Sequence, residues 1–460
     1  MSTKPGKIIE LDSKALRDKL SNLAKREGIH QWDLGAACSK DSSVQVDRGE
    51  AKQLKGAQRS SITVRVWNNK GLVGITSTSD LSDIGLEKAL IGAHQASDFG
   101  NANDIPAFSP LAKAPLPNLD RPLRPAQGIS RLLELLKQAE AELLSRHPAI
   151  QTVPYNALGE TNSERIYLNS DGALRQMKRT DACIYLYARA EEDGRKPRSA
   201  GAVRLAVGSQ DLDIKGCIDE AAELTISHLN YGPIDTGRYL VCFTPEAFLD
   251  LIGAFSSIFN ARSILDGVSL SQRDSIGSSI AVPFFSLYDN GMHPANVGAS
   301  TFDGEGTPTQ KLCLINQGRL ENFLHSEATA RAFGVDPTGH AGLGAKVSVG
   351  PDWFEVSSTE THNSTINKLD HNSSQETFVL IDGLNALHAG VKASQGSFSL
   401  PFSGWLLKKG EKISIEAATV AGDIRTLLNN IEYMESEQVI THNGLCPHVW
   451  INGLSISGEA

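Results

Sequence analysis

The chain lacks the cysteine spacing and the long apolar runs that mark several large classes of protein. Its six cysteines are scattered over 460 residues without a C-x-x-C pair, which argues against a zinc ribbon and against a disulfide-stapled secreted domain. No apolar stretch reaches the length of a membrane span, and residues 1–10 contain no apolar run of the secretory type. We therefore expect a cytoplasmic protein with reduced thiols and no membrane contact.

Basic residues are also too few for tight binding of nucleic acid. The chain has 44 Lys and Arg against 53 Asp and Glu, for a formal net charge of −9. Binding to a phosphate backbone depends on a concentrated excess of Lys and Arg, so nucleic acid is not an expected partner. The sequence also lacks a Walker loop, a dinucleotide fingerprint and a G-x-S-x-G elbow, and no nucleotide cofactor is expected.

The length of the chain predicts two or three domains rather than a single core. Prolines crowd between residues 101 and 128 while helical periodicity disappears, a pattern typical of an extended connector. We expect an α+β fold with four parts: an N-terminal α+β domain at 1–100, a Pro-rich linker at 101–128, a middle α+β domain at 129–235, and a C-terminal domain dominated by antiparallel β-sheet at 236–460.

Apolar residues at helical spacing predict helices in the first two domains. The helices are expected at 13–26, 83–97, 130–146 and 213–229. Segments rich in β-branched residues predict strands between them, at 44–46, 62–67, 165–169, 182–190 and 202–207.

The segment from Ser300 to Gly339 is the most informative part of the chain. Asp303 to Gly306 form a glycine-rich acidic turn, and the alternation of Lys311 to Ile315 predicts a short strand. A second turn is followed by a helix expected over Leu320 to Phe333, which Gly334 ends.

This segment resembles the C-terminal domain of the TldD/PmbA family, whose members carry a D-x-E-G-T-P-T turn followed by a strand, G-x-L and a helix. Ile62 to Thr78 is similar to the family's V-R-V-x-x-x-x-x-G strand pair. Gly396 to Ser399 and Val420 to Ile424 are similar to its G-x-F-S and A-G-x-I/L steps. The resemblance covers nearly the whole chain in order.

The resemblance implies where a zinc site would lie. Active members are zinc peptidases with H-E-x-x-x-H after the first strand of the C-terminal domain and a cysteine near the chain end. Here the strand Tyr239 to Phe243 is followed by Thr244 to Gly253, which contains no histidine. Thr244 and Pro245 instead suit the start of an ordinary helix.

Cys446 lies at roughly the place of the family's cysteine ligand, with His448 close by. One thiolate and one imidazole do not complete a tetrahedral zinc site, so a buried inert thiol is the favoured interpretation. We assign no catalytic residue, no metal and no cofactor to this chain, and expect zinc in a partner subunit.

The resemblance is to the PmbA (TldE) branch, which lacks the zinc motif. It implies a non-catalytic subunit that forms a heterodimer with a zinc-bearing TldD-like subunit. The complex would cut unfolded peptides or the leader segments of peptide precursors. Without the partner we expect self-association, for which a homodimer is one possible form, because a large apolar partner-facing surface tends to be covered. Two alternatives stay open: an independent metallopeptidase with an unrecognised site, and a homodimeric peptide-binding protein.

Peptide binding by strand addition is expected at exposed sheet edges. The candidate residues are Lys311, Leu312, Cys313 and Leu314 in one strand, and Ser397, Phe398 and Ser399 in another.

Two further patterns have a catalytic and a structural interpretation. Asp303 and Glu305 could form a carboxylate pair, although carboxylates on glycine-rich turns more often accept backbone hydrogen bonds. His325-Ser326-Glu327 matches H-x-E, but the P-C-x-x-C of the zinc deaminases is missing from the chain.

Overall fold

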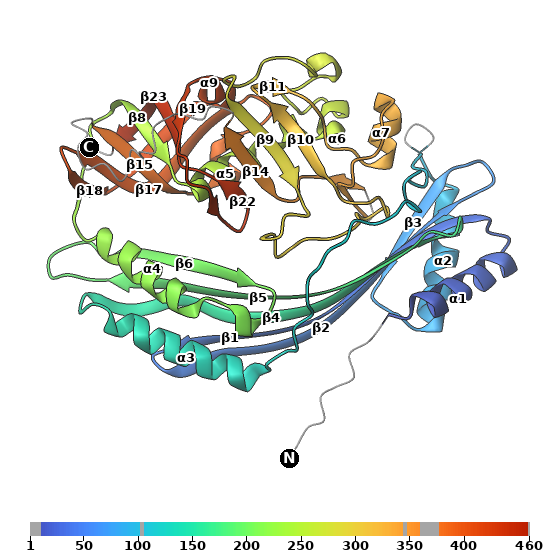
Figure 1. The fold of residues 1–460 in the computed structure, drawn as a ribbon. Helices are drawn as coiled ribbons and strands as arrows, with labels where there is room; N and C mark the ends of the chain where they lie inside the picture. The colour runs from blue at the N-terminus through green and yellow to red at the C-terminus, as the bar shows by residue number, and fades with distance from the viewer. Residues whose placement is uncertain (1–10, 102–104, 344–346, 359–376, 459–460) are drawn as a thin grey trace.

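The computed structural model describes residues 11–101, 105–343, 347–358 and 377–458. The fold is α+β, as the sequence predicts. It consists of a long curved sheet with helices at its ends and a C-terminal domain that lies over this sheet (Figure 1). Among the described residues, no helix combines the length and the apolar character that crossing a membrane requires.

The first sheet has six antiparallel strands in the order β3-β2-β1-β4-β5-β6. β1 pairs with β4 from Asp33 opposite Asn169 to Val44 opposite Leu158. The strands predicted for the N-terminal and middle domains therefore belong to one continuous sheet. Their bounds are Gln31–Asp47 (β1), Glu50–Trp67 (β2), Val73–Thr78 (β3), Ile150–Asn169 (β4), Leu174–Ala190 (β5) and Arg198–Ala206 (β6).

Two pairs of helices cover opposite ends of this sheet and bury separate apolar cores against it. One core lies under α1 (Ser13–Arg26) and α2 (Asp83–Ser97), and the other under α3 (Ile129–Ser145) and α4 (Ile214–Ser227). The predicted helices are thus confirmed to within a residue or two. Caps explain part of this agreement, because the side chains at the N-caps of α1, α2 and α4 accept backbone N–H groups.

The C-terminal domain packs two sheets around one large core. The larger sheet follows the order β15-β8-β23-β19-β17-β18-β7, and a further β15–β17 pairing closes part of it into a ring. The smaller follows β11-β10-β9-β14-β22-β21. The strands are Tyr231–Gly232 (β7), Gly237–Phe243 (β8), Phe285–Asn290 (β9), Lys311–Asn316 (β10), Arg319–Leu320 (β11), Ala341–Gly342 (β12), Ser348–Val349 (β13), Phe354–Ser358 (β14), Phe378–Leu384 (β15), Val391–Lys392 (β16), Ser397–Lys408 (β17), Glu411–Ile415 (β18), Ala418–Asp423 (β19), Ile431–Met434 (β20), Val439–Ile440 (β21), Gly444–Cys446 (β22) and Val449–Gly458 (β23).

The helices of this domain are short. Thr244 caps α5 and Pro245 is its first residue, as predicted. The helix expected from Leu320 begins later, because Leu320 pairs in β11 and Ser326 caps α7 through a capping box. The helices are Pro245–Ala254 (α5), Ala261–Leu265 (α6), Glu327–Phe333 (α7), Leu387–Gly390 (α8) and Ile424–Asn429 (α9).

The described part of the Pro-rich segment, from residue 105 onward, is hydrogen-bonded to both of its neighbours. Trp67 Nε1 on β2 donates to Pro106 O at 2.7 Å. Arg121 reaches the C-terminal domain and donates to Val297 O at 2.7 Å. The segment is therefore a fixed connection between the sheet and the C-terminal domain.

A buried ion network also joins the first sheet to the C-terminal domain. Arg65 on β2 donates through Nε to Asp33 Oδ1 on β1 at 2.9 Å, and through Nη1 to Glu305 Oε1 at 3.1 Å. Tyr167 on β4 adds a hydrogen bond from its hydroxyl to Asp33 Oδ2 at 3.1 Å. Glu305 also accepts the amide of Glu327, the first residue of α7, at 2.8 Å. The side chains of Arg65 and Asp33 are 0% exposed, so each charge depends on its partners.

Replacing Arg65 with Met should destabilise the protein strongly, because it leaves two carboxylates buried without their counter-ion. Breaking a buried pair in this way costs about 3–5 kcal/mol. Denaturant unfolding followed by circular dichroism measures the change. The matched control is Arg59→Met on the same strand, where the arginine side chain is 63% exposed and pairs with Asp41. Equal effects of the two variants would contradict the assigned role.

A buried histidine fixes the end of α4 against the C-terminal domain and gives stability a pH dependence. His228 Nδ1 lies 2.7 Å from Ser414 Oγ, and its ring stacks on Trp405 at 4.6 Å between centroids. Burial, aided by Arg198 and Lys412, lowers the pKa of His228 from 6.5 to about 4. The unfolded state therefore binds the proton more tightly.

The stability that His228 contributes is thus fully present above pH 6.5 and is lost as the pH falls towards about 4, at up to about 1.4 kcal/mol per pH unit. His228→Gln should flatten the dependence of the unfolding midpoint on pH in this window. His30→Gln, at an exposed position, should leave it unchanged. An unchanged slope in His228→Gln would contradict this assignment.

Candidate functional site

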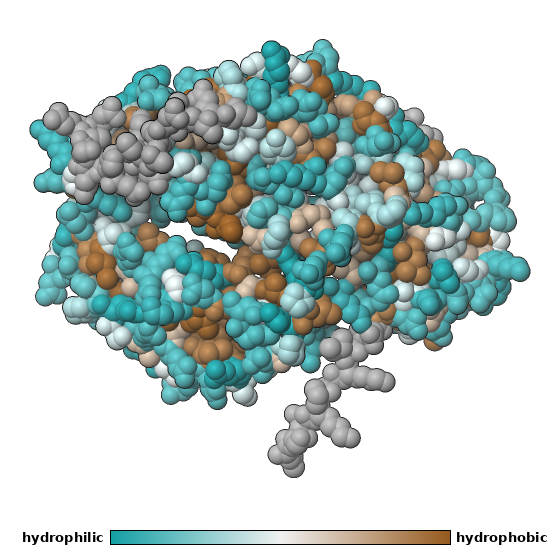
Figure 2. Space-filling view, viewed as in Figure 1, coloured by the Kyte–Doolittle hydropathy of each residue, from teal (hydrophilic) through white to brown (hydrophobic). Residues whose placement is uncertain are grey.

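An open cleft separates the first sheet from the C-terminal domain. Figure 2 shows a gap through the molecule between these two parts, bordered in places by apolar residues. Tyr155 on β4, Tyr187 on β5 and Leu205 on β6 keep 72%, 40% and 42% of their surface exposed. The strand register places all three on the sheet face opposite α3 and α4. We call this face, which is turned towards the C-terminal domain, the inner face.

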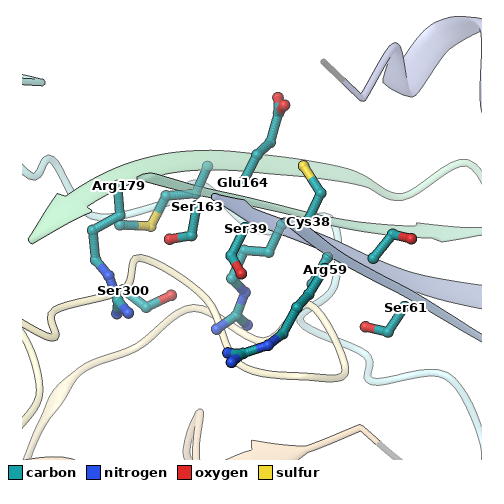
Figure 3. Close-up of a pocket in the computed structure, with 12 residues that line it drawn as sticks. Cys38, Ser39, Arg59, Ser61, Ser163, Glu164, Arg179 and Ser300 are labelled. Atoms are coloured by element: carbon teal, nitrogen blue, oxygen red, sulfur yellow. The ribbon is translucent and has the colours of Figure 1, made fainter. Parts of the chain in front are cut away.

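A cavity of about 450 Å³ lies between the inner face and the loop that carries Ser300. Arg59 on β2 and Arg179 on β5 extend their guanidinium groups into it, and Ser39, Ser163 and Ser300 add hydroxyls (Figure 3). Each arginine also contacts a neighbouring carboxylate, Asp41 and Asp181 respectively.

The side chains that point into this cavity are mainly hydrogen-bond donors. Arginine and serine donors can bind the carbonyl oxygens or a carboxylate of a peptide. Alternation along the strands points Cys38 and Glu164 to the other face of the sheet, so these two side chains contribute little to the chemistry of the cavity.

Carboxylates gather on and around α5. Glu246 lies in the first turn of the helix and Asp250 follows one turn later. His442 Nδ1 is 3.5 Å from Glu246 Oε1, and Asn443 Nδ2 donates to Asp250 Oδ1 at 2.7 Å. Burial, with help from the charge of Glu246, raises the pKa of Asp382 at the end of β15 to about 6.

The same carboxylates interact with the middle part of the chain. Burial raises the pKa of Glu246, and Glu220 on α4 raises it further, whereas His442 and Arg204 on β6 lower it. The acidic group on α5 therefore faces α4 and β6, the elements below the C-terminal domain in Figure 1.

The two strands predicted to bind peptide differ from expectation. Ser397 and Phe398 in β17 pair with β16 on one side and β19 on the other, so the predicted free edge is wrong at these residues. Ser399 belongs to the same strand and pairs with Ala421. These residues form the interior of a sheet, because the chain after β15 folds back to supply β16.

β10 is partly open. Its residues Cys313 and Leu314 use their carbonyls to accept hydrogen bonds from the Asn322 side chain and the Glu321 amide, both at 2.9 Å. Lys311 and Leu312 pair with β9, and β11 pairs with β10 only from Ile315 onward. On the side away from β9, no described strand pairs with Lys311 and Leu312.

The acidic turn has a structural role. Asp303 Oδ1 accepts the amides of Glu305 and Thr307 at 2.8 and 3.0 Å, and Asp303 Oδ2 accepts the amide of Ala341 at 2.9 Å. Since Glu305 is bound to Arg65, the two carboxylates act as backbone and ion-pair acceptors.

The H-x-E pattern does not form a site. His325 packs edge-on against Phe333 at 5.0 Å, and Glu327 Oε2 accepts the amide of Ala107 at 2.8 Å.

Comparison with known proteins agrees with this architecture. The model of the PmbA/TldA metallopeptidase C-terminal domain matches residues 236–458, and that of the central domain matches residues 125–229. The chain belongs to the PmbA/TldD family. Metalloprotease PmbA of Escherichia coli O157:H7 is 22% identical over 98% of both chains. A metalloprotease of Methanothermobacter thermautotrophicus is 24% identical over 72% of both chains.

Solved structures share the fold. TldE from Thermococcus kodakarensis superposes with a TM-score of 0.83 at 19% identity, covering 96% of this chain and 100% of that one. A Thermotoga maritima protein, whose name connects it with modulation of a DNA gyrase, superposes with a TM-score of 0.84 at 22% identity and the same coverage.

The residues around α5 do not fit the zinc ion of the family's peptidases. Among the described residues, the donor atoms of three His, Cys, Asp or Glu side chains lie within 4.8 Å of one another in one place, Asp289–His340–Asp352, and not at α5. α5 carries the carboxylates Glu246 and Asp250 and contains no histidine. Zinc peptidases hold the ion with about three ligands and leave one position for water.

Cys446 does not compensate for the missing histidines. Its side chain is completely buried, its Sγ donates to Pro447 O at 3.2 Å, and burial raises the pKa of its thiol well above the usual value.

The acidic cluster of Glu246, Asp250 and Asp382 was missed in the sequence, because helix α5 and the distant strand β15 bring it together. A carboxylate pair one helical turn apart on α5 was the available signal.

Cys446 should resist thiol reagents in the folded protein, since the reactive species is the exposed thiolate. Reaction with Ellman's reagent should modify at most Cys183 and Cys313, the two partly exposed cysteines, and all six after denaturation. A Cys183→Ser/Cys313→Ser double variant should show no rapid labelling. Rapid labelling of Cys446, or its protection by added Zn²⁺, would contradict the buried, inert assignment.

Proposed function

We propose that this chain is the non-catalytic subunit of a cytoplasmic TldD/TldE-type zinc metallopeptidase complex that cuts unfolded peptides or peptide-precursor leaders. The observation that carries the proposal is the chemistry of α5. At the position of the family's zinc motif the helix presents Glu246 and Asp250 and no histidine, and the thiol of Cys446 is buried.

The cleft supports a role in holding peptide. Extended polypeptide offers carbonyl groups along its whole length, and Arg59, Arg179 and the serine hydroxyls of the cavity are donors that can bind them. Tyr155, Tyr187 and Leu205 add exposed apolar surface on the inner face. Recognition of this kind depends on backbone and general apolar character, which suits substrates of varied sequence.

The zinc-bearing subunit would supply the ion that polarises the peptide carbonyl and activates water. This chain would complete the walls of the chamber and position the peptide. Its acidic net charge and the thiols of all six cysteines agree with a cytoplasmic enzyme complex.

The purified chain alone should not hydrolyse unstructured peptides, with or without added Zn²⁺, because α5 has no ligand set that leaves an open zinc position. Mixing it with a family member that carries H-E-x-x-x-H should give turnover that a chelator abolishes. Mass spectrometry of the products from an unfolded protein substrate measures cleavage by the lone chain and by the mixture.

Substituting the two arginines that line the cavity then tests what this subunit contributes to peptide binding. Arg59→Ala/Arg179→Ala should raise KM of the mixed enzyme about tenfold, whereas Arg17→Ala, on the exposed side of α1, should have no effect. Chelator-sensitive turnover by the lone chain would overturn the proposal in favour of an independent peptidase. Peptide binding without assembly would favour the homodimeric binding protein.

A further inference from the structure

A buried cluster of ligand-type side chains lies in the C-terminal domain, away from α5. Asp289 lies near the end of β9, His340 precedes β12 and Asp352 precedes β14. Their donor atoms lie within 4.8 Å of one another. Asp289 and His340 have side chains that are 0% exposed, whereas Asp352 lies at the surface.

The hydrogen bonds around His340 leave its Nε2 without a partner among the described residues. Its Nδ1 lies 2.8 Å from Thr338 Oγ1, and either atom of this pair can be the donor. The Thr338 hydroxyl accepts the amide of His325 and lies 3.3 Å from His325 O. When the hydroxyl donates to His325 O, Nδ1 carries the hydrogen and the lone pair of neutral His340 is on Nε2.

That lone pair faces another acceptor. His340 Nε2 and Asp289 Oδ1 lie 3.4 Å apart, and neither has a hydrogen-bond partner among the described residues. Asp289 Oδ2 is already occupied by the amide of Asp352 at 2.7 Å. Two buried acceptors that face each other need a proton or a cation between them.

The surrounding charge favours a cation with more than one positive charge. Three carboxylates lie here, those of Asp289, Asp303 and Asp352. The positive charge of the Arg165 side chain acts on Asp303 and Asp352. A bound cation would offset the repulsion among these neighbouring carboxylates.

Space for the Asp352 carboxylate depends on a glycine. A Cβ built on Gly291 would lie 2.6 Å from Asp352 Oδ2. The backbone beside the cluster is therefore shaped to admit this carboxylate.

We propose that Asp289, His340 and Asp352 bind one divalent transition-metal ion behind the acidic turn at Asp303. One imidazole and two carboxylates suit Zn²⁺ better than Ca²⁺ or Mg²⁺, which prefer oxygen ligands alone. Ligands of tetrahedral zinc stand roughly 3.3 Å apart at bond lengths of about 2.0–2.1 Å, so donor atoms that lie within 4.8 Å of one another would close in by up to about 1.5 Å.

The bound ion has a structural role. It ties β9 to the segments before β12 and β14, and the Nδ1–H bond to Thr338 orients the imidazole from the second shell. The site is closed on the side of Asp289 and His340, and its opening to solvent lies at Asp352.

The test uses the full chain after EDTA treatment, with Zn²⁺ as the probe at pH 7.5. Isothermal titration calorimetry and metal analysis should find one ion per chain with a dissociation constant below about 1 µM, and binding should raise the melting temperature. His340→Gln and Asp352→Asn should each weaken binding at least about a hundredfold, because each removes a ligand. Glu246→Gln/His442→Gln, at α5, should leave binding unchanged.

Each other outcome overturns the site. These outcomes are no saturable binding by the wild-type chain below about 10 µM, binding that survives both ligand substitutions, or binding lost only in the α5 variant. The first would leave His340 as an imidazolium paired with Asp289. If His340→Gln does not fold, Asp352→Asn decides, since its side chain is at the surface. The peptidase assay tests the proposed function separately from this site. We expect the lone chain to bind zinc here and yet to cleave no peptide.

Discussion

The ion network centred on Arg65 is the interaction on which the arrangement of this molecule depends. Its guanidinium joins Asp33 of the neighbouring strand to Glu305 of the acidic turn, and Glu305 in turn holds the first amide of α7. Charges buried to this extent are tolerated only in each other's presence. The network therefore fixes the C-terminal domain in position over the sheet, and with it the cavity beneath Ser300 and the cleft that α5 faces.

Local chemistry explains what could be predicted from the sequence. Helices α1, α2 and α5 have caps and apolar stripes whose signal lies within a few residues. The bounds of α1 and α2 and the start of α5 at Pro245 were predicted correctly. The strands were predicted too short, because the outer part of β2 has polar, exposed residues on both faces. Pairing with β1 rather than apolar alternation keeps it extended. The helix expected from Leu320 was misplaced, since β-pairing at Leu320 and the cap at Ser326 both outweighed its periodicity.

The candidate site was predictable only where a residue's own segment carries the information. The composition of α5 was enough to conclude that it lacks a zinc motif. The edge predicted at Ser397 and Phe398 was wrong, because a later turn of the chain supplies β16 as a second partner. Asp289 lies in β9, and His340 and Asp352 lie in two separate loops. The three have no common spacing in the sequence, so their proximity is a property of the fold alone.

The long β1–β4 ladder has a consequence for how the protein can be divided. Family comparison recognises units that begin at residues 125 and 236, yet twelve register positions of β1 have their partners in β4. A fragment cut at the Pro-rich segment would expose a long unpaired strand on each half, which is the kind of surface that recruits other chains and aggregates. The smallest part of the N-terminal half that can fold alone is consequently the whole six-stranded sheet with its helices. The two parts of this sheet, on either side of the Pro-rich segment, are candidates for reassembly from separately produced polypeptides.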